Sequence, residues 1–248
     1  MSREEKILGL VIDGFPLGES DQVVNVFTSQ GNLVRFVAKG ARKTKSRNSA
    51  VVQPFVLGRY IISTAYALPI LRQADIVKSY PRIRMDLARC TAALSALELV
   101  KLTVAEAGGE HAAFKLTRQL LEQLDSHVSD SLLFDAFRLQ FLSLLGYGLV
   151  WNQCVLCGCE TTRGRLNWLD GGICCANCSG EKGLPVAADT LGIVRRLANT
   201  PLVGVSRMAA TKEQRRQCSA LLDQIVVWHT DGKTKTQAFR NMIDDLQQ

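Results

Sequence analysis

Short apolar runs with the character of β-strands fill the first 80 residues. Each run is rich in β-branched or aromatic side chains, turn residues separate the runs, and none has a helical period. The runs are ILGLVI (7–12), VVNVFT (23–28), LVRFVA (33–38), FVLGRYIIS (55–63) and ILRQADIV (70–77). Five closely spaced strands predict a small barrel, closed or partly open.

Farther along, the apolar positions recur three and four residues apart, which predicts helices. The helices are expected at about 83–108, 112–124, 131–145, 189–197, 212–228 and 235–246. In the third of these, Phe134, Phe137 and Phe141 share one face, and we interpret this aromatic stripe as core. The pattern therefore predicts an α+β protein of more than one domain. An N-terminal five-stranded OB-fold β-barrel (1–80) is followed by an α-helical domain (81–248) that contains an embedded cysteine segment.

Two cysteine pairs mark that segment. Cys154 and Cys157 form one C-x-x-C pair, and Cys175 and Cys178 form another, with seventeen residues between the pairs. Each pair can sit on a tight turn whose backbone N–H groups face the sulfurs, so together they can deliver four thiolates to one tetrahedral Zn²⁺ ion. We predict one structural zinc site in a zinc-finger-like insertion at about 150–183. Four thiolates leave no open position for water or substrate, so this metal would hold structure.

Neighbouring cysteines leave the ligand set partly open. Cys159 and Cys174 each lie next to a ligand, and Cys175 is preferred to Cys174 because a loop from Cys174 to Cys178 would be wider. A redox role is disfavoured, because two pairs in a Gly-rich segment with few strand signals differ from the thioredoxin-like pattern. A zinc deaminase is excluded, because no His in the sequence has a Glu two residues later.

Charge points to an anionic partner. The 248 residues are 47% apolar and carry a formal net charge of +7. Residues 1–80 hold eleven Lys and Arg against six Asp and Glu, and residues 184–248 hold nine against six. The first apolar run is broken by Asp13 and has no signal-peptide character, so we expect a cytoplasmic protein whose thiols stay reduced.

The densest charge lies between the third and fourth predicted strands. Six basic residues fall within thirteen positions that contain no acid: Arg35, Lys39, Arg42, Lys43, Lys45 and Arg47. Unpaired cationic groups keep their water unless anions replace it, so this run is an exposed surface suited to a polyanion. A basic loop beside a small five-stranded barrel is a common arrangement for binding single-stranded nucleic acid. A solvated loop that is basic only for solubility would fit the charge equally well.

No motif of catalysis accompanies these features. The sequence has no Gly-rich phosphate loop, and its three histidines, His111, His127 and His229, show no arrangement with a nucleophile or a carboxylate pair. We therefore expect a protein that is not an enzyme.

The order of barrel, helical block and embedded cysteine segment resembles the bacterial recombination mediator family RecO. Several motifs carry the resemblance: GESD (18–21), FT (27–28), KGARKTKS (39–46), QPF (53–55), FDAFRLQFLSLLGYG (134–148), CVLCG (154–158) and GGICCANC (171–178). It covers most of residues 6–180. One departure is Phe15, where the family often has a basic residue. Like Phe36 and Tyr60, Phe15 is either a base-stacking residue or barrel core, and core is the favoured interpretation.

This resemblance implies a factor for DNA repair and homologous recombination. Such a factor would bind single- and double-stranded DNA through the basic run and anneal complementary strands. With RecR it would help load RecA onto DNA coated by the single-stranded DNA-binding protein, in the bacterial cytoplasm at the nucleoid. The family also recognises the acidic, hydrophobic C-terminal tail of that coating protein through its helical domain. Arg138, expected at the rim of the aromatic stripe, is the candidate contact.

Two alternatives belong to other functional classes. One is a zinc-containing enzyme that processes nucleic acid, which turnover would reveal. The other is a zinc-stabilised adaptor for protein contacts, in which the basic run is incidental.

Overall fold

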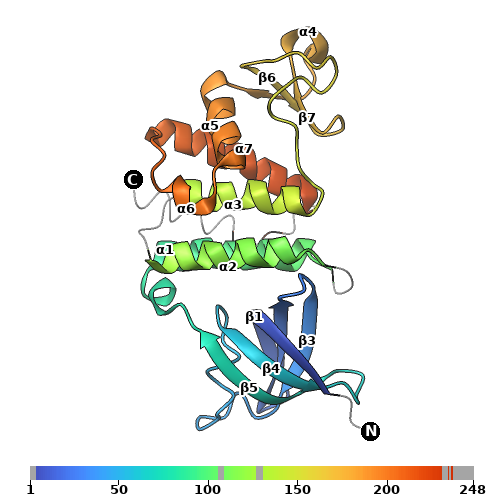
Figure 1. Ribbon diagram of the computed structural model, residues 1–248, viewed down its shortest axis with the longest axis vertical. Helices are drawn as coiled ribbons and strands as arrows, with labels where there is room; N and C mark the ends of the chain where they lie inside the picture. The colour runs from blue at the N-terminus through green and yellow to red at the C-terminus, as the bar shows by residue number, and fades with distance from the viewer. Residues whose placement is uncertain (1–3, 106–108, 127–130, 231–233, 235, 237–248) are drawn as a thin grey trace. The chain divides into compact units, whose positions relative to one another are not determined.

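The computed structural model describes residues 4–105, 109–126, 131–230, 234 and 236, and divides the chain into two compact units (Figure 1). Unit 1 comprises Met1–Val128 and Thr234–Gln248, and unit 2 comprises Ser129–Lys233. The helix expected at about 235–246 lies almost wholly outside the described residues, as does the expected helix end at Gly108.

Five strands of unit 1 form a closed barrel, which confirms the predicted five-stranded barrel, and their order is β1-β2-β3-β5-β4. The strands are β1 (Glu4–Leu17), β2 (Asp21–Thr28), β3 (Leu33–Ala38), β4 (Leu57–Ser63) and β5 (Ile70–Lys78). The first strand is longer than expected, because Phe15, Pro16 and Leu17 continue the ladder opposite the start of β2. Only Gly18–Ser20 remain as the turn between β1 and β2.

The barrel core is formed by one face of each strand and is closed by the long loop after β3. Phe36 and Tyr60 are both fully buried there, with ring centroids 5.4 Å apart, so their interpretation as core is confirmed. Val51 and Val52, from the loop between β3 and β4, belong to the same cluster. The Tyr60 hydroxyl donates a hydrogen bond to the Val51 carbonyl oxygen (3.1 Å), which joins the loop to the barrel wall.

Phe15 differs from the other two aromatic residues, because its side chain is 46% exposed. The expectation that Phe15 is core is therefore wrong. The pairing of β1 with β2 shifts between Val11 and Asp13, which leaves Ile12 as an extra residue in β1. A bulge of this kind reverses which side of the strand each later residue faces. Simple alternation along the sequence would have kept Phe15 on the same face as Val11.

Two antiparallel helices cover part of the outer surface of the barrel. A short 3-10 helix, η1 (Pro81–Met85), leads into α1 (Leu87–Thr103), and α2 (His111–Ser126) follows. Phe114 of α2 meets Phe27 of β2 edge to face at 5.6 Å, and the Leu33 N–H donates to the Ala105 carbonyl (3.2 Å). The two helices therefore pack against the outside of the barrel and belong with it to one compact unit, which extends to Val128.

Unit 2 combines a helical layer with the cysteine segment. Its helices are α3 (Ser131–Leu144), α5 (Ala188–Asn199), α6 (Leu202–Val205) and α7 (Lys212–His229). Phe134, Phe137 and Phe141 are buried, which confirms that the aromatic stripe is core.

The cysteine segment holds a three-stranded sheet in the order β7-β6-β8 and the short helix α4 (Ala176–Ser179). The strands are β6 (Gly164–Asn167), β7 (Gly172–Cys174) and β8 (Leu184–Val186). We did not expect this sheet, because its strands are only three or four residues long and carry little apolar pattern. None of the helices in the described residues is long and apolar enough to cross a membrane.

Candidate metal centre and nucleic-acid interface

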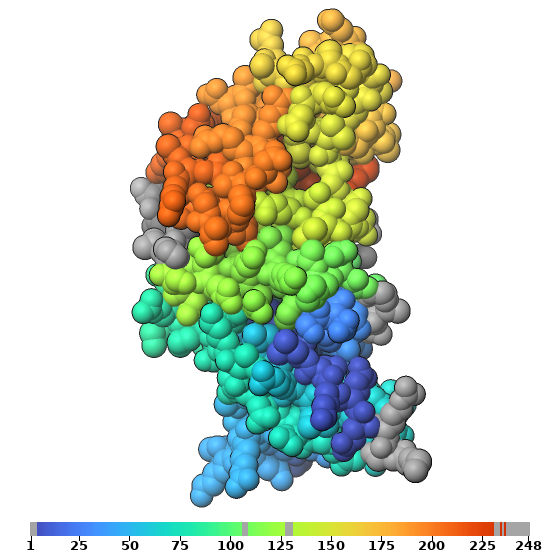
Figure 2. Space-filling model, in the orientation of Figure 1, coloured from blue at the N-terminus to red at the C-terminus, as the bar shows by residue number. Residues whose placement is uncertain are grey.

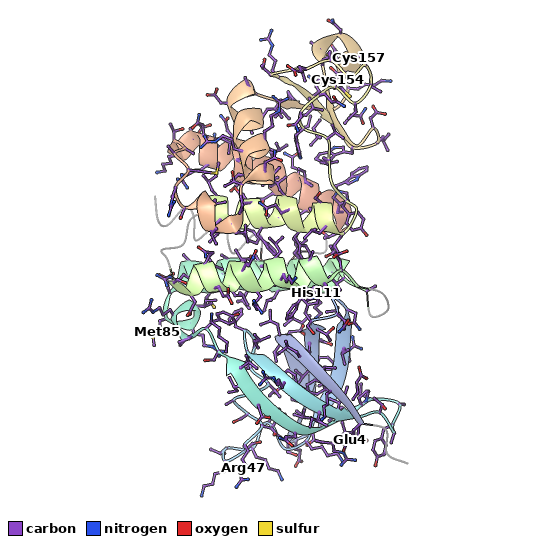
Figure 3. All side chains as sticks on the ribbon, viewed as in Figure 1. Glu4, Arg47, Met85, His111, Cys154 and Cys157 are labelled. Atoms are coloured by element: carbon purple, nitrogen blue, oxygen red, sulfur yellow. The ribbon has the colours of Figure 1, made fainter. Side chains whose placement is uncertain are left out.

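The four predicted zinc ligands come together in unit 2. The Sγ atoms of Cys154, Cys157, Cys175 and Cys178 all lie within 4.8 Å of one another, and those of Cys157 and Cys175 are 3.8 Å apart. A tetrahedral site with Zn–S bonds of about 2.3 Å has S–S edges of about 3.8 Å. Figure 3 shows Cys154 and Cys157 close together in this segment. The arrangement therefore has the size of a four-thiolate metal site.

Tight turns place the sulfurs. In the first turn the Gly158 N–H donates to the Cys154 carbonyl (2.8 Å), and in the second the Ser179 N–H donates to the Cys175 carbonyl (2.9 Å). Gly158 and Gly180 follow the turns with φ of 73° and 52°, a left-handed conformation that glycine adopts without the strain caused by a side chain. Glycine therefore suits the position that follows each pair.

Backbone N–H groups also favour the thiolate form of two of these cysteines. The Cys175 N–H lies 3.3 Å from the Cys154 sulfur and is the main reason that the pKa of Cys154 is lowered to about 6. A hydrogen bond from the Cys178 N–H likewise lowers the pKa of Cys175. Two of the four sulfurs are thus favoured as thiolates, the form that binds a soft divalent cation, whereas hydrogen bonding with Cys157 and Cys175 raises the pKa of Cys178.

Two further cysteines lie beside the cluster but differ from it. Cys174 is fully buried, burial raises its pKa, and its sulfur lies 4.0 Å from Asp170 Oδ2. Cys159 is exposed, and hydrogen bonding with Cys157 and Cys175 raises its pKa to about 12. The geometry thus favours Cys175 over Cys174, and it leaves Cys159 as a neighbouring thiol.

An arginine that no sequence motif marks fastens the segment to the helices of unit 2. Arg195 of α5 donates to the carbonyl oxygens of Trp151 (2.8 Å), Asn152 (3.3 Å) and Thr161. Trp168, just after β6, stacks on Trp228 of α7 with ring centroids 5.8 Å apart. These contacts join residues far apart in sequence, which is why the sequence alone does not reveal them.

Arg138 is not at the rim of the aromatic stripe, so this expectation is wrong. Its side chain is 2% exposed and forms ion pairs with Asp135 on α3 and with Asp223 on α7. Its guanidinium also lies 4.9 Å above the centre of the Phe134 ring. A buried guanidinium needs anionic partners, and Asp223 lies 85 residues away in the sequence. Arg138 therefore joins two helices instead of presenting a surface charge.

The basic loop, residues 39–56 between β3 and β4, carries five of the six predicted DNA-binding residues. All six side chains are exposed. Figure 3 shows Arg47 directed away from the barrel, and in Figure 2 the light-blue atoms of this region project from the end of the barrel opposite α1 and α2. In the part of the chain that the structure describes, no hydrogen bond or ion pair engages the side chains of Lys39, Lys43, Lys45 and Arg47.

The start of the basic loop is anchored to the turn between β1 and β2. The Gly40 N–H donates to Asp21 Oδ1 (2.8 Å), and the Arg42 N–H donates to the Ser20 carbonyl (3.0 Å). The Arg42 guanidinium donates to the carbonyls of Gly18 (3.1 Å) and Glu19 (3.2 Å). The hydrogen bond from Gly40 is the main reason that the pKa of Asp21 lies below its ordinary value. The loop therefore begins from a fixed base.

Arg35 belongs to a different set of contacts. Its Nε donates to Asn25 Oδ1 (2.9 Å), and the Asn25 amide donates to Asp13, which also pairs with Lys101 of α1. This polar row crosses β1, β2 and β3 on the outer surface of the barrel. Arg35 is thus exposed but partly committed to its neighbours on the sheet.

Both parts of the chain match models of one protein family. Residues 1–80 match the family described as Recombination protein O N terminal, and residues 84–238 match Recombination protein O C terminal. A relative from Geobacter metallireducens is 32% identical over 240 residues, covering 95% of this chain and 96% of its own. A relative from an Exiguobacterium species is 33% identical over 187 residues, or 75% of each chain. Both relatives carry the name DNA repair protein RecO.

Proposed function

This chain belongs to the recombination protein O family of DNA repair and recombination proteins, and we propose that it is a recombination mediator without catalytic activity. It binds single- and double-stranded DNA and anneals complementary strands. With RecR it helps load RecA onto DNA coated by the single-stranded DNA-binding protein, in the bacterial cytoplasm at the nucleoid. The observation that carries the DNA-binding part is the group of unengaged cations on an anchored loop beside the barrel.

Four of the six basic residues have the largest role in this proposal. The side chains of Lys39, Lys43, Lys45 and Arg47 have no hydrogen bond or ion pair among the described residues, so they can contact phosphates without breaking existing bonds. Arg35 and Arg42 contribute less, because each already donates to acceptors of the protein. Contacts to phosphates release counterions and read no bases, so binding would tolerate any sequence and weaken steeply with salt.

Annealing follows from the same charges. Two complementary strands repel each other through their phosphates, and a cationic surface that neutralises both lowers this repulsion. No bond is formed or broken, which agrees with a protein that is not an enzyme.

We propose that Cys154, Cys157, Cys175 and Cys178 hold one structural Zn²⁺ ion. The size of the cluster and the two N–H-stabilised thiolates support this assignment. Bound zinc would cross-link the two turns and supply no open coordination position for a reaction.

The contact with the tail of the single-stranded DNA-binding protein remains a proposal for the helical part of the chain. Arg138 does not support it as a surface cation, because its guanidinium is buried between two carboxylates.

Strand annealing tests the proposed function directly. Two variants remove the same charge from different places. The loop triple variant is Lys43→Ala, Lys45→Ala and Arg47→Ala, and the control triple variant changes the exposed Lys115, Lys182 and Lys212 to Ala. We expect wild-type and control proteins to accelerate annealing of complementary fluorescent oligonucleotides and the loop triple variant to lose most of this activity. Equal annealing by the two variants would contradict the role of the loop, and a wild-type protein without DNA binding would contradict the function itself.

A further inference from the structure

An exposed aromatic side chain lies where the barrel meets the basic loop. Phe15 is 46% exposed and Leu17 is 43% exposed, both at the end of β1. Phe15 pairs with Val23 of β2, and Val23 pairs with Val37 of β3. Because Val24 and Phe36 point into the core, the alternation of strands directs Val23, Val37 and Phe15 to the outer side of the sheet, where Phe15 is exposed and the two valines are buried.

The basic loop begins beside the next cross-strand row. Leu17 pairs with Asp21, and Gln22 pairs with Ala38, so Lys39 follows directly after the residue opposite Gln22. Side chains in adjacent cross-strand rows lie about 7–8 Å apart or less. On this side of the sheet, the row that holds Phe15 is therefore followed by a row that holds Leu17, Asp21 and, just after β3, Lys39.

Hydrogen bonds join the start of the basic loop to the turn that follows β1. Arg42 bonds to the carbonyls of Gly18 and Glu19, directly after β1, and Asp21 accepts the Gly40 N–H. Glu19 and Asp21 are the acidic residues of this turn, and the carboxylate of Asp21 already accepts the hydrogen bond from Gly40. The turn and the start of the loop thus form one rigid, positively charged platform.

A second exposed aromatic residue belongs to the loop that reaches the same end of β3. Tyr66, in the loop between β4 and β5, is 56% exposed. The Val37 N–H donates to the Pro69 carbonyl of that loop (2.8 Å), which fixes the loop beside β3. Five-stranded OB-fold barrels bind oligonucleotides on the face formed by β2 and β3 and through the β1–β2 and β4–β5 loops. Both flanking segments here offer an aromatic ring to such a ligand.

We infer that Phe15 is a base-stacking residue, so that this platform binds an unpaired nucleobase on the Phe15 ring while the loop cations hold the adjoining phosphates. The inference rests on the proposed DNA binding and adds to it the group that distinguishes single strands from duplex. Every base has an apolar face that can stack on an aromatic ring, so this contact is tolerant of sequence. In duplex DNA the faces of the bases are already stacked, and the ring has nothing to bind.

Three probes separate stacking from charge. They are oligo-dT, a duplex of equal length, and an abasic oligonucleotide that keeps the phosphates without the bases. We expect Phe15→Ala to weaken binding of oligo-dT on the order of tenfold and to leave binding of the duplex and the abasic strand unchanged. The matched control is Ile76→Ala on β5, whose side chain is 49% exposed in wild type; it should bind all three probes like wild type.

Fluorescence gives a second readout that a loss of folding cannot imitate. We expect Phe15→Trp to bind oligo-dT like wild type and to show additional quenching on oligo-dT relative to wild type, with no such quenching on the abasic strand or for Ile76→Trp. Wild-type affinity of Phe15→Ala for oligo-dT, or an equal loss on all three probes, would overturn the stacking role. Failure of wild type to bind any probe would overturn the proposed function as well, so the two failures are distinguishable.

Discussion

The basic loop of unit 1 and the cysteine segment of unit 2 are both irregular stretches of chain, but they are held by different forces. The basic loop places Ala41, Val51 and Val52 in the barrel core and bonds its start to the turn before β2. The cluster at the thiols of the cysteine segment consists of cysteines with Val155 packed against them, beside the buried Leu166 and Ile173 of the small sheet. The first region is therefore ordered by a larger apolar core, whereas we expect a metal to supply the main cross-link at the thiols of the second.

Metal removal tests this contrast with the largest expected effect. Structural zinc contributes about 10–16 kcal/mol to the folding of small zinc-finger peptides at pH 7. We expect Cys157→Ser or a strong chelator to abolish metal binding and to open residues 154–186 to hydrogen exchange, while exchange in the barrel strands stays slow. Metal content, measured per chain, should fall from about one to zero.

The matched control for that experiment is Cys159→Ser, which removes the exposed neighbouring thiol. It should keep about one metal ion per chain. A metal-free Cys157→Ser protein whose segment exchanges as slowly as wild type would show that the segment is ordered without metal.

The barrel should respond instead to loss of its core. Phe36→Ala removes a fully buried ring from the cluster that the loop helps to close. We expect the free energy of unfolding of unit 1 to fall by about 3–5 kcal/mol, because a cavity replaces the ring. Phe15→Ala is the control, since its exposed side chain should change that free energy by less than about 0.5 kcal/mol. Similar losses in the two variants, measured by denaturant unfolding, would contradict the reversed facing of β1 after its bulge.

Substitutions of Asp21 distinguish a role in anchoring the basic loop from a simple effect of its negative charge on DNA binding. Removing an acid from a cationic surface should strengthen DNA binding if charge alone matters. The hydrogen bond from Gly40 predicts the opposite for Asp21→Ala, because the base of the loop would loosen. Asp21→Asn keeps an acceptor oxygen, so we expect it to bind DNA at least as well as wild type. Stronger binding by Asp21→Ala would contradict the anchoring role.

The pH dependence of this anchor has a defined sign. The Gly40 N–H lowers the pKa of Asp21 below its ordinary value in the folded protein. A carboxyl group whose pKa is lower in the folded than in the unfolded protein stabilises the fold. This contribution is complete at pH values above the pKa of the unfolded state, and it is lost as the pH falls through the lowered pKa of the folded state. The Gly40 amide should therefore remain protected from exchange at pH 5.

Local sequence patterns predicted those features whose cause is also local. Short runs of β-branched and aromatic residues were sufficient for the five-stranded barrel, and the spacing of the two C-x-x-C pairs was sufficient for the thiol cluster. The six basic residues are exposed, as a dense run of like charge requires. Their separate roles depend on bonds to Asn25 and to the turn before β2, which the run itself does not encode.

Other features depend on contacts between distant residues. Arg138 is buried because Asp223, far along the chain, supplies a partner. Phe15 faces outward because one extra residue shifts the register of β1. The packing of α1 and α2 against the barrel depends on the contact between Phe27 of β2 and Phe114 of α2. Neither the strand pattern around Phe27 nor the helical pattern around Phe114 predicts that contact.

The salt dependence of single-stranded DNA binding tests the central claim most directly. For single strands, log Kobs falls with log[salt] by about 0.7 per phosphate contact. We predict that the loop triple variant has a slope shallower than wild type by about 2, whereas the control triple variant, which has the same net charge, keeps the wild-type slope. Equal slopes for the two variants would contradict the assignment of the DNA-binding surface to the basic loop.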